Sequence, residues 1–465
     1  MAIAESVGLH VLVIPYPAQG HMLSLLDLAH LLSSRARLAV TVAVTTKNRP
    51  LLDPLLSRSP DVVPLVLPFP NYPALPPGLE NSKDLRPAFF RHLIHALAGL
   101  REPLLRWARS TPHPPTAIIS DMFLGWTTDL AAELGVPRLV FSPSGALAVA
   151  ITNVLWRRMP QRSNLDDHDC PISFPEIPGS PVFPWRHLSM LYRTYKQGDP
   201  ISEFIKEGLL SNNTSWGFVF NTFSDLEMVY LDRLRKDLGN PRVWAVGPLA
   251  QPDGPAERGG VSSAVASEIM EWLDGCPEDS VVLVCFGSQK VLAPPQAEAL
   301  AAGLERSGAR FVWCARGATA VPVGFEGRVA GRGLVVREWA PQVAILGHPA
   351  VAAFLTHCGW NSVLEAVAAG VAVLTWPMGA DQFANAKLVV EEAGVGVALC
   401  DGGDAVPDPD EVARVVAESL GQSGKELSNR AKELSRKALA AVKKGGNSFK
   451  ELDEMVAELS KLRVK

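Results

Sequence analysis

The sequence predicts an α/β protein built from two Rossmann-like, doubly wound domains. The chain has 465 residues, more than one hydrophobic core usually fills, so two domains are expected. Short apolar runs alternate with segments of helical spacing along both halves. Each half opens on a strand, a loop with one glycine (Gly20 or Gly287) and a helix. We therefore expect two such domains that face each other across a cleft.

The strand pattern divides the chain into two series. The first series is predicted at residues 10–15, 41–44, 117–120 and 138–141, and the second at 281–286, 310–315, 334–337, 351–355 and 371–376. Residues 251–263, QPDGPAERGGVSS, are rich in Pro, Gly and Ser and predict a linker. The expected domains are then 1–250 and 264–445. A helix in the last segment, 446–465, is predicted to begin with Ser448 as its N-cap.

Composition excludes several classes of function. A net charge of -4 is small for this length and argues against a nucleic-acid partner. The six cysteines are widely spaced without a Cys-x-x-Cys pair, which indicates buried free thiols in a reducing compartment. The N-terminus carries no evident signal peptide, and no apolar run reaches the length of a membrane span. We expect a cytoplasmic monomer.

Residues 339–382 form the most informative segment, because polar and aromatic side chains gather there in otherwise apolar α/β sequence. A buried strand at 351–355 leads through a polar turn to a helix at 361–369, which places His357 at a helix start. The backbone N–H groups of Gly359, Trp360, Asn361 and Ser362 precede the first intrahelical bonds. With the helix dipole they favour an anion such as a diphosphate.

Side chains of the same segment suit the other parts of a nucleotide sugar. Glu365 lies four residues after Asn361, on the same helical face, where a carboxylate could accept both hydroxyls of a ribose. Trp339 precedes Ala340 and Pro341, which fix the local backbone, so its ring could support a uracil base. Asp381 and Gln382 follow the next strand and fall at the same carboxyl edge of the sheet, where ligands bind in open α/β sheets.

An acid–base pair is predicted in the N-terminal half. His21 follows the first strand and lies at the start of a helix at 22–32, and Asp121 follows the strand at 117–120. Both therefore reach the carboxyl edge of one sheet. A carboxylate that accepts the Nδ1 proton of the imidazole would leave Nε2 to take a proton from an acceptor hydroxyl.

These motifs resemble those of the plant UDP-glycosyltransferases over nearly the whole chain. The match runs in register through 339–382. It also includes the Gly-His after the first strand, the Ile-Ser-Asp that ends on Asp121, Val246-Gly247-Pro248-Leu249 and Phe286-Gly287-Ser288. The resemblance implies a GT-B fold whose last helix returns to the N-terminal domain. It also implies inverting transfer of a sugar from a UDP-sugar, the co-substrate, to a small acceptor, with His21 as base, Asp121 as its partner and no metal or other cofactor.

The resemblance also assigns binding residues. The donor residues that it implies are Gly20, Ser288, Trp339, Ala340, Gln342, His357, Trp360, Asn361, Ser362, Glu365, Asp381 and Gln382. A Gln at position 382 favours UDP-glucose, while UDP-rhamnose, UDP-galactose and UDP-xylose remain alternatives. The acceptor is expected to be a plant phenolic such as a flavonoid, bound near Phe123, Trp126, Ser144 and Leu147. Three positions depart from the family pattern: Ser24 and Ala372 replace Pro, and Ala352 replaces Gly.

Other functions are set aside on sequence grounds. Asp167-His168-Asp169 has the letters of a metal-binding Asp-x-Asp but lies in a polar, unpatterned stretch, and His92 and His95 lack a third ligand nearby in sequence. No Gly-x-Gly-x-x-Gly follows either opening strand, which counts against an NAD(P) oxidoreductase. Neither Ser144 nor Ser288 lies in the Gly-x-Ser-x-Gly elbow of a serine hydrolase. A non-catalytic ligand-binding relative would be recognised by the loss of His21 or Asp121, and both are present.

Overall fold

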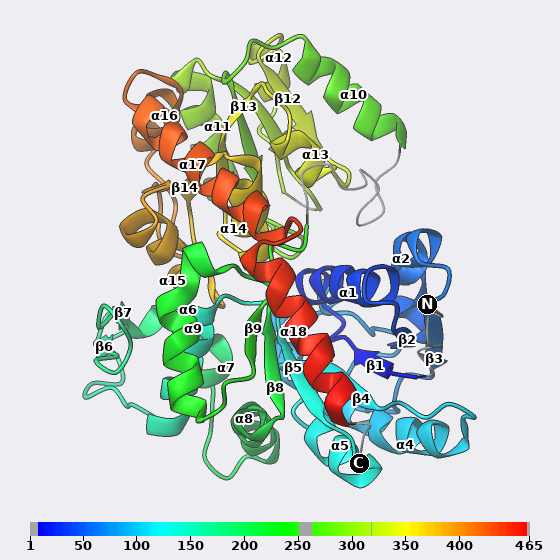
Figure 1. The fold of residues 1–465 in the computed structure, drawn as a ribbon. Coiled ribbons are helices and arrows are strands. Elements are labelled where there is room, and N and C mark those ends of the chain that lie inside the picture. The colour runs from blue at the N-terminus through cyan, green and yellow to red at the C-terminus, as the bar shows by residue number, and fades with distance from the viewer. Residues whose placement is uncertain (1–7, 251–262, 318, 463–465) are drawn as a thin grey trace. The chain divides into compact units, whose positions relative to one another are not determined.

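The computed structural model describes residues 8–250, 263–317 and 319–462 (Figure 1). Contacts divide the chain into two units. Unit 1 comprises the described residues of Met1–Arg186, Met190–Leu249 and Lys444–Lys465, and unit 2 those of His187–Ser189 and Ala250–Lys443. The predicted linker at 251–263 lies outside the described residues except for Ser263, where a helix begins.

Unit 1 is built on a parallel sheet. Its strands lie in the order β3 (Val63–Leu67), β2 (Ala39–Thr45), β1 (His10–Ile14), β4 (Ala117–Asp121), β5 (Arg138–Ser142), β8 (Gly217–Phe220) and β9 (Val243–Ala245). The chain runs outward from β1 to β3 and then returns to β4 beside β1, so the order reverses between β1 and β4. Ligands of doubly wound folds bind at such a reversal, outside the carboxyl ends of the strands.

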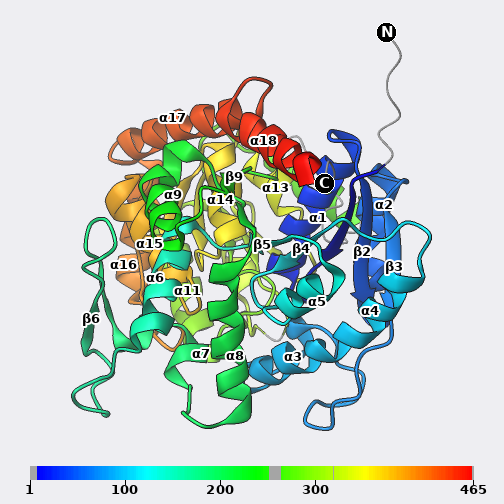
Figure 2. The ribbon, with the colours of Figure 1, turned by 60° about the horizontal axis from the view of Figure 1, so that its bottom comes forward.

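Helices surround this sheet (Figure 2). They are α1 (Gln19–Ser34), α2 (Asp53–Arg58), α3 (Phe90–Leu97), α4 (Arg101–Ser110), α5 (Thr127–Leu134), α6 (Ala146–Arg158), α7 (Met190–Arg193), α8 (Pro200–Ser211), α9 (Ser224–Leu238) and α18 (Asn447–Lys461). Short 3-10 turns lie at Thr46–Leu52, Ser82–Asp84, Pro87–Phe89, Ala98–Leu100, Trp185–His187 and Asn212–Thr214, and a hairpin pairs β6 (Pro171–Ser173) with β7 (Val182–Pro184).

The last helix belongs to unit 1, where α18 packs beside β9 and its residues Leu452, Met455 and Leu459 are buried in the same hydrophobic core as residues of β1 and β2 (Figure 1). The prediction that Ser448 caps this helix is wrong. The N-cap is Gly446, and Ser448 lies inside the first turn, where its Oγ donates to the carbonyl of Gly247 at 2.7 Å. The hydroxyl thus joins the helix to the segment that leaves β9.

Unit 2 repeats the strand arrangement of unit 1. Its sheet has the order β12 (Gly333–Val336), β11 (Arg310–Cys314), β10 (Val281–Cys285), β13 (Val351–Thr356), β14 (Ala372–Thr375) and β15 (Gly396–Ala398). Its helices are α10 (Ser263–Asp274), α11 (Pro294–Ser307), α12 (Phe325–Arg328), α13 (Gln342–Leu346), α14 (Trp360–Ala369), α15 (Gln382–Lys387), a π-helical turn at Leu388–Glu392, α16 (Pro409–Leu420) and α17 (Gly424–Val442). The predicted pair of Rossmann-like domains is confirmed.

The predicted strands are all found, with ends that differ by one or two residues, because each is a near-continuous apolar run. In β10, Val281, Val282, Leu283 and Val284 are fully buried, which is typical of a parallel sheet covered on both faces. The sequence missed β3, β8, β9 and β15 and the two strands of the hairpin, β6 and β7. β3 contains a proline and leaves Val63 and Val66 exposed, and the others have three or four residues. None of the described helices is both long and apolar enough to cross a membrane.

Candidate active site

The helix that carries His21 begins earlier than predicted. α1 starts at Gln19, with Ala18 as N-cap, so His21 is the third helical residue rather than the residue before the helix. A tight turn ends β1, in which Ala18 N donates to Tyr16 O at 2.8 Å. Ser24, which replaces the family's proline, lies within the continuous helix α1. Its Oγ donates to the carbonyls of Gly20 and His21, one turn earlier, at 3.2 and 3.3 Å.

His21 and Asp121 form a hydrogen-bonded pair. His21 Nδ1 lies 2.8 Å from Oδ2 of Asp121, the last residue of β4. The Asp121 side chain is fully buried, and 21% of the His21 side chain is exposed. Asp121 Oδ1 also accepts a bond from the Phe123 N–H at 2.9 Å, which fixes the carboxylate. A buried carboxylate on Nδ1 orients the ring and makes Nε2 the nitrogen that can accept a proton.

Two aromatic rings hold the imidazole. The Phe123 ring centroid lies 4.9 Å from that of His21, and Tyr16 meets the same ring edge-on at 5.2 Å. Burial, and then the negative charge of Asp121, raises the pKa of Tyr16, so its hydroxyl stays protonated. The sequence analysis did not single out Tyr16. Its position between the end of β1 and the start of α1 could have indicated that it lies beside His21.

The four predicted acceptor residues lie in different environments. Phe123 contacts His21 and is partly exposed. Trp126 is buried and lines a small apolar pocket together with Met22 and other residues; its Nε1 has no hydrogen-bond partner. That pocket has about 20 Å³ of space for water-sized molecules, room for one or two waters rather than a ligand. Ser144 is partly exposed, and Leu147 is 2% exposed, so its side chain belongs to the core.

Arg138, which the sequence did not single out, is buried close to Asp121. Its guanidinium donates to the hydroxyls of Ser120, Thr127 and Ser215 and to Oδ1 of Asn212 at 2.7 to 3.0 Å. Burial lowers the pKa of Arg138 to about 9, and the charge of Asp121 opposes that shift. The Arg138 guanidinium of β5 is thus solvated mainly by neutral side-chain oxygens, and its hydrogen bonds connect β5 to β4, to the start of α5 and to the turn before β8.

In unit 2, His357 lies between two glycines at the turn from β13 to α14. An ideal Cβ built on Gly287 would lie 2.7 Å from its ring, and one on Gly359 would lie 2.6 Å from Nε2. Burial lowers the pKa of His357 to about 4, so the ring is neutral at physiological pH. The first helical bond of α14 runs from Val363 N to Gly359 O, and the preceding N–H groups lie beside this neutral imidazole.

Two further pairs lie at the same edge of unit 2. Gln342, the first residue of α13, donates from Nε2 to Glu365 Oε2 at 2.7 Å and to Ser362 Oγ at 3.1 Å. The ring of Trp339 is covered on one side by the guanidinium of Arg316, 4.1 Å from the centroid. The structure thus joins the predicted residues Gln342, Ser362 and Glu365 and adds Arg316, which the sequence did not reveal.

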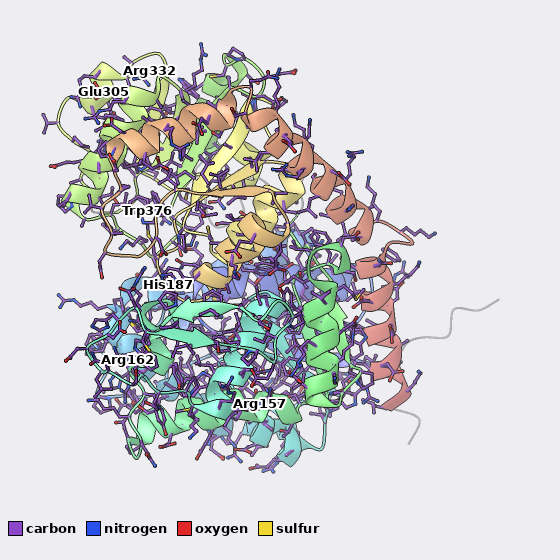
Figure 3. All side chains as sticks on the ribbon, turned by 90° about the vertical axis from the view of Figure 1, so that its left-hand side faces the viewer. Arg157, Arg162, His187, Glu305, Arg332 and Trp376 are labelled. Atoms are coloured by element: carbon purple, nitrogen blue, oxygen red, sulfur yellow. The ribbon has the colours of Figure 1, made fainter. Side chains whose placement is uncertain are left out.

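Gln382 is anchored to its own loop. Its Oε1 accepts bonds from the N–H groups of Met378 and Gly379 at 2.8 and 3.0 Å, which orients the side chain at the start of α15. Asp381 is the N-cap of that helix and is partly exposed. The loop follows Trp376, labelled in Figure 3, whose Nε1 donates to Gly402 O at 3.1 Å and whose ring packs edge-on against Phe286.

The remaining predicted donor residues are divided between the units. Ser288 follows Gly287 after β10, Ala340 follows Trp339, and Trp360 and Asn361 begin α14, all in unit 2. Gly20 lies in α1 and is exposed, so it belongs to unit 1 with His21. Ala352 and Ala372, which replace the family's Gly and Pro, are buried inside β13 and β14.

Comparisons with known proteins decide the family. Residues 259–402 match the family described as UDP-glucuronosyl and UDP-glucosyl transferases. UDP-glycosyltransferase 89B2 of Stevia rebaudiana is 51% identical, with 98% of each chain covered. The flavonol 3-O-glucosyltransferase UGT89B1 of Arabidopsis thaliana is 50% identical over 97% of this chain and 96% of its own. The chain belongs to the plant UDP-glycosyltransferases.

Solved structures agree with this assignment and with the GT-B fold. The crystal structure of Arabidopsis thaliana UGT89C1 complexed with UDP-L-rhamnose is 38% identical, with a TM-score of 0.81 over 97% of this chain and 98% of that one. The structure of the same plant enzyme with quercetin has a TM-score of 0.78 at 36% identity, over 97% and 99% of the two chains. This UDP-glycosyltransferase therefore has the two Rossmann-like domains of its family.

Two motifs set aside on sequence grounds have partners of their own in the structure. Asp167 and Asp169 are exposed; Arg162, labelled in Figure 3, donates to Asp167 O at 3.3 Å, and Arg186 bonds Asp169 Oδ1 at 2.6 Å. His92 and His95 on α3 pack against aromatic rings, including that of Tyr72. Within the described part of the chain, no group of three or more His, Cys, Asp or Glu side chains could hold a metal ion.

The prediction of six buried free thiols is correct in part. All six cysteines are free, but only Cys285, Cys314 and Cys358 are buried, while Cys170, Cys276 and Cys400 are partly exposed. The partly exposed thiols lie outside the apolar strand interiors, in the segments before β6 and β10 and after β15.

Proposed function

We propose that this enzyme transfers glucose from UDP-glucose to a hydroxyl of a phenolic acceptor such as a flavonoid, with inversion at the anomeric carbon. The observation that carries the proposal is the 2.8 Å bond between His21 Nδ1 and the fully buried carboxylate of Asp121. That arrangement suits a general base, because the imidazolium formed on proton transfer is stabilised by the adjacent charge.

The proposed reaction is a single displacement. The acceptor hydroxyl gives its proton to His21 Nε2 as its oxygen forms a bond to the anomeric carbon of the sugar. The bond from that carbon to the β-phosphate oxygen breaks, and UDP leaves with the electron pair. In this proposal unit 1 binds the acceptor and unit 2 binds the UDP-sugar.

Donor binding is proposed to rest on three features of unit 2. The N–H groups at the start of α14 and the neutral imidazole of His357 would bind the diphosphate, since helix starts bind anions. Glu365, held by Gln342, would accept the ribose hydroxyls. Trp339 would stack on the uracil with the face that Arg316 does not cover. No metal is expected, because these donors would themselves stabilise the diphosphate charge.

The choice of glucose is proposed from Gln382 and Asp381, whose polar groups can read hydroxyl positions on a pyranose. Rhamnose is the foremost alternative, because the related plant enzyme at 38% identity was solved with UDP-L-rhamnose. UDP-galactose and UDP-xylose remain further alternatives. The names of the relatives support a flavonoid acceptor, since one is a flavonol 3-O-glucosyltransferase and another structure contains quercetin. A catalytically silent binding protein is disfavoured by the intact pair of His21 and Asp121.

A product screen tests the proposal directly. The purified chain would be incubated with each of UDP-glucose, UDP-rhamnose, UDP-galactose and UDP-xylose against a panel of flavonols, flavones, coumarins and simple phenols, and products would be identified by mass spectrometry. We expect a hexose adduct of a flavonoid with UDP-glucose and an anomeric configuration opposite to that of the donor. Transfer of rhamnose alone, or retention of configuration, would overturn the proposal. We also expect a cytoplasmic monomer, which fractionation and light scattering would test.

A further inference from the structure

Cys285 and Cys314 end two neighbouring strands at the carboxyl edge of unit 2. They are paired in the register of β10 and β11, which run parallel, so their side chains extend from the same face of the sheet. Neighbouring strands lie about 4.8 Å apart, within the Cα separation of about 4.4 to 6.8 Å that a disulfide spans. Both cysteines are free. The backbone therefore places two thiols where they can be joined without unpairing the strands.

The surroundings make the two thiols chemically different. Hydrogen bonding with Cys314, and then the Gly287 N–H and the positive charge of Arg316, lower the pKa of Cys285 against the effect of burial. The same pairing and burial raise the pKa of Cys314. Cys285 thus has more thiolate character, and Cys314 keeps its proton. A nucleophilic thiol beside a resolving thiol is the arrangement that reacts with peroxide.

The other buried cysteine provides an internal comparison. Cys358 is fully buried, and desolvation raises its pKa; its thiol donates to the carbonyl of Thr356 at 3.6 Å rather than to another sulfur. In contrast, Cys285 and Cys314 are 8% and 6% exposed. All three thiols are buried, so the pair differs from Cys358 in that each of its thiols has a second cysteine beside it in the sheet register.

The thiol pair adjoins residues of the proposed donor site. Cys285 pairs in register with Thr356 of β13, the residue before His357. Arg316, whose charge acts on both thiols, covers the Trp339 ring, and the charge of Glu365 acts on Cys285. Gly287, which donates to the Cys285 sulfur, lies against the His357 ring. A change at Cys285 therefore reaches residues proposed to bind the base, the ribose and the diphosphate.

We propose that Cys285 and Cys314 form a peroxide-oxidised dithiol site whose disulfide weakens donor binding. The Cys285 thiolate attacks hydrogen peroxide, and with one proton this gives a sulfenic acid and water. The Cys314 thiol then attacks the sulfenic sulfur, the S–S bond forms, and a second water leaves. Peroxide is reduced and the two thiols are oxidised by two electrons. The effect on the donor rests on the proposed function, whereas the disulfide itself does not.

The covalent step is tested by mass spectrometry on a chain in which Cys170, Cys276 and Cys400 are replaced by Ser. After treatment with hydrogen peroxide, non-reducing digestion should yield a peptide cross-linked between positions 285 and 314, which a dithiol reductant separates. In the same background, Cys314→Ser should leave a sulfenic acid on Cys285 that dimedone traps, and Cys285→Ser should leave Cys314 unreacted. If the cross-linked peptide were absent and Cys358 were oxidised as fast as Cys285, the proposed site would be overturned.

The effect on the donor is tested separately by calorimetry with UDP. The oxidised chain should bind UDP at least roughly tenfold more weakly, a loss that the reductant reverses, and bound UDP should slow the oxidation. The double variant Cys285→Ser/Cys314→Ser should bind UDP equally well before and after peroxide. A disulfide with unchanged UDP affinity would overturn the coupling to the donor site. If reduced protein binds no UDP at all, the proposed donor site is wrong, while the mass spectrum still decides the disulfide.

Discussion

A Cβ atom on Gly359 would lie 2.6 Å from Nε2 of His357, so the imidazole occupies the space that a side chain at position 359 would need. Gly287 approaches the same ring from the loop after β10, and an ideal Cβ on it would lie 2.7 Å away. The two glycines therefore fix the ring at the start of α14. Gly287 has a left-handed φ of 75°, whereas the φ of Gly359 is -58°, which any residue can adopt.

Gly359→Ala should weaken UDP binding because the added methyl group displaces His357 without straining the backbone. If His357 donates to the diphosphate as proposed, the loss of this one hydrogen bond corresponds to roughly ten- to hundredfold in Kd. Calorimetry with UDP measures it. The matched control is Gly327→Ala, whose Cβ meets no atom within 4 Å and which should bind UDP like the wild type. Equal affinity of both variants would show that His357 does not depend on the glycine.

The neutral state of His357 predicts how the stability of the fold depends on pH. Burial lowers its pKa from 6.5 to about 4, so between these values the unfolded chain binds a proton that the folded chain does not. The free energy of unfolding should therefore fall as the pH drops from 6.5 towards 4, by at most about 3 kcal/mol from this group, and level off below.

Urea unfolding at several pH values tests this contribution. His357→Asn should show a shallower loss of stability between pH 6.5 and 4 than the wild type. His113→Asn, at an exposed position, should follow the wild-type curve. Parallel curves for the wild type and His357→Asn would contradict a neutral imidazole at position 357.

His21→Ala should lower kcat by about 10² to 10⁴ and leave UDP affinity nearly unchanged, since the proposed base would act on the acceptor. Asp121→Asn should also be strongly impaired, because an amide at 2.8 Å from Nδ1 cannot stabilise the imidazolium. Turnover and calorimetry on each variant separate catalysis from donor binding, with His113→Ala as the exposed control. If His21→Ala kept half of the wild-type kcat, His21 would have no role as a base.

The sequence predicted the elements that place these residues but not all of their partners. His21 and Asp121 could be assigned to one sheet edge because parallel strands are continuous apolar runs whose carboxyl ends meet. The position of Arg138 inside a shell of hydroxyls and the cover of Trp339 by Arg316 depend on tertiary packing. The early start of α1 depends on the turn from Tyr16 to Ala18, whose Pro17 marks a turn but does not tell which of the following residues begins the helix.

Activity should persist after removal of divalent metals, because in the proposed site the start of α14 and His357 would supply the donors for the diphosphate. The test is turnover after treatment with a chelator, with and without added Mg²⁺ or Mn²⁺. Asp167→Asn/Asp169→Asn should behave like the wild type, since both residues are exposed and Asp169 is paired with Arg186. If the wild type were active only with added metal, and the double variant were not activated by that metal, the Asp-x-Asp would be a metal site after all.

Two substitutions of Gln382 together test whether this side chain selects the sugar. Its Oε1 already accepts bonds from the N–H groups of Met378 and Gly379, so the amide Nε2 is the group proposed to donate to a sugar hydroxyl. Gln382→Ala would remove that donor and also both loop bonds. Gln382→Glu keeps two acceptor oxygens for the loop while it removes the amide donor.

We therefore expect both variants to lower kcat/KM for UDP-glucose by roughly ten- to hundredfold, because a buried polar group that loses its partner costs about 1 to 3 kcal/mol. UDP affinity should change much less, since UDP lacks the sugar. Competition among UDP-glucose, UDP-galactose, UDP-xylose and UDP-rhamnose measures the preference, and Gln422→Ala, at an exposed position, is the control. If Gln382→Glu kept the wild-type preference while Gln382→Ala lost it, Gln382 would support the loop at 378–379 and would not read the sugar.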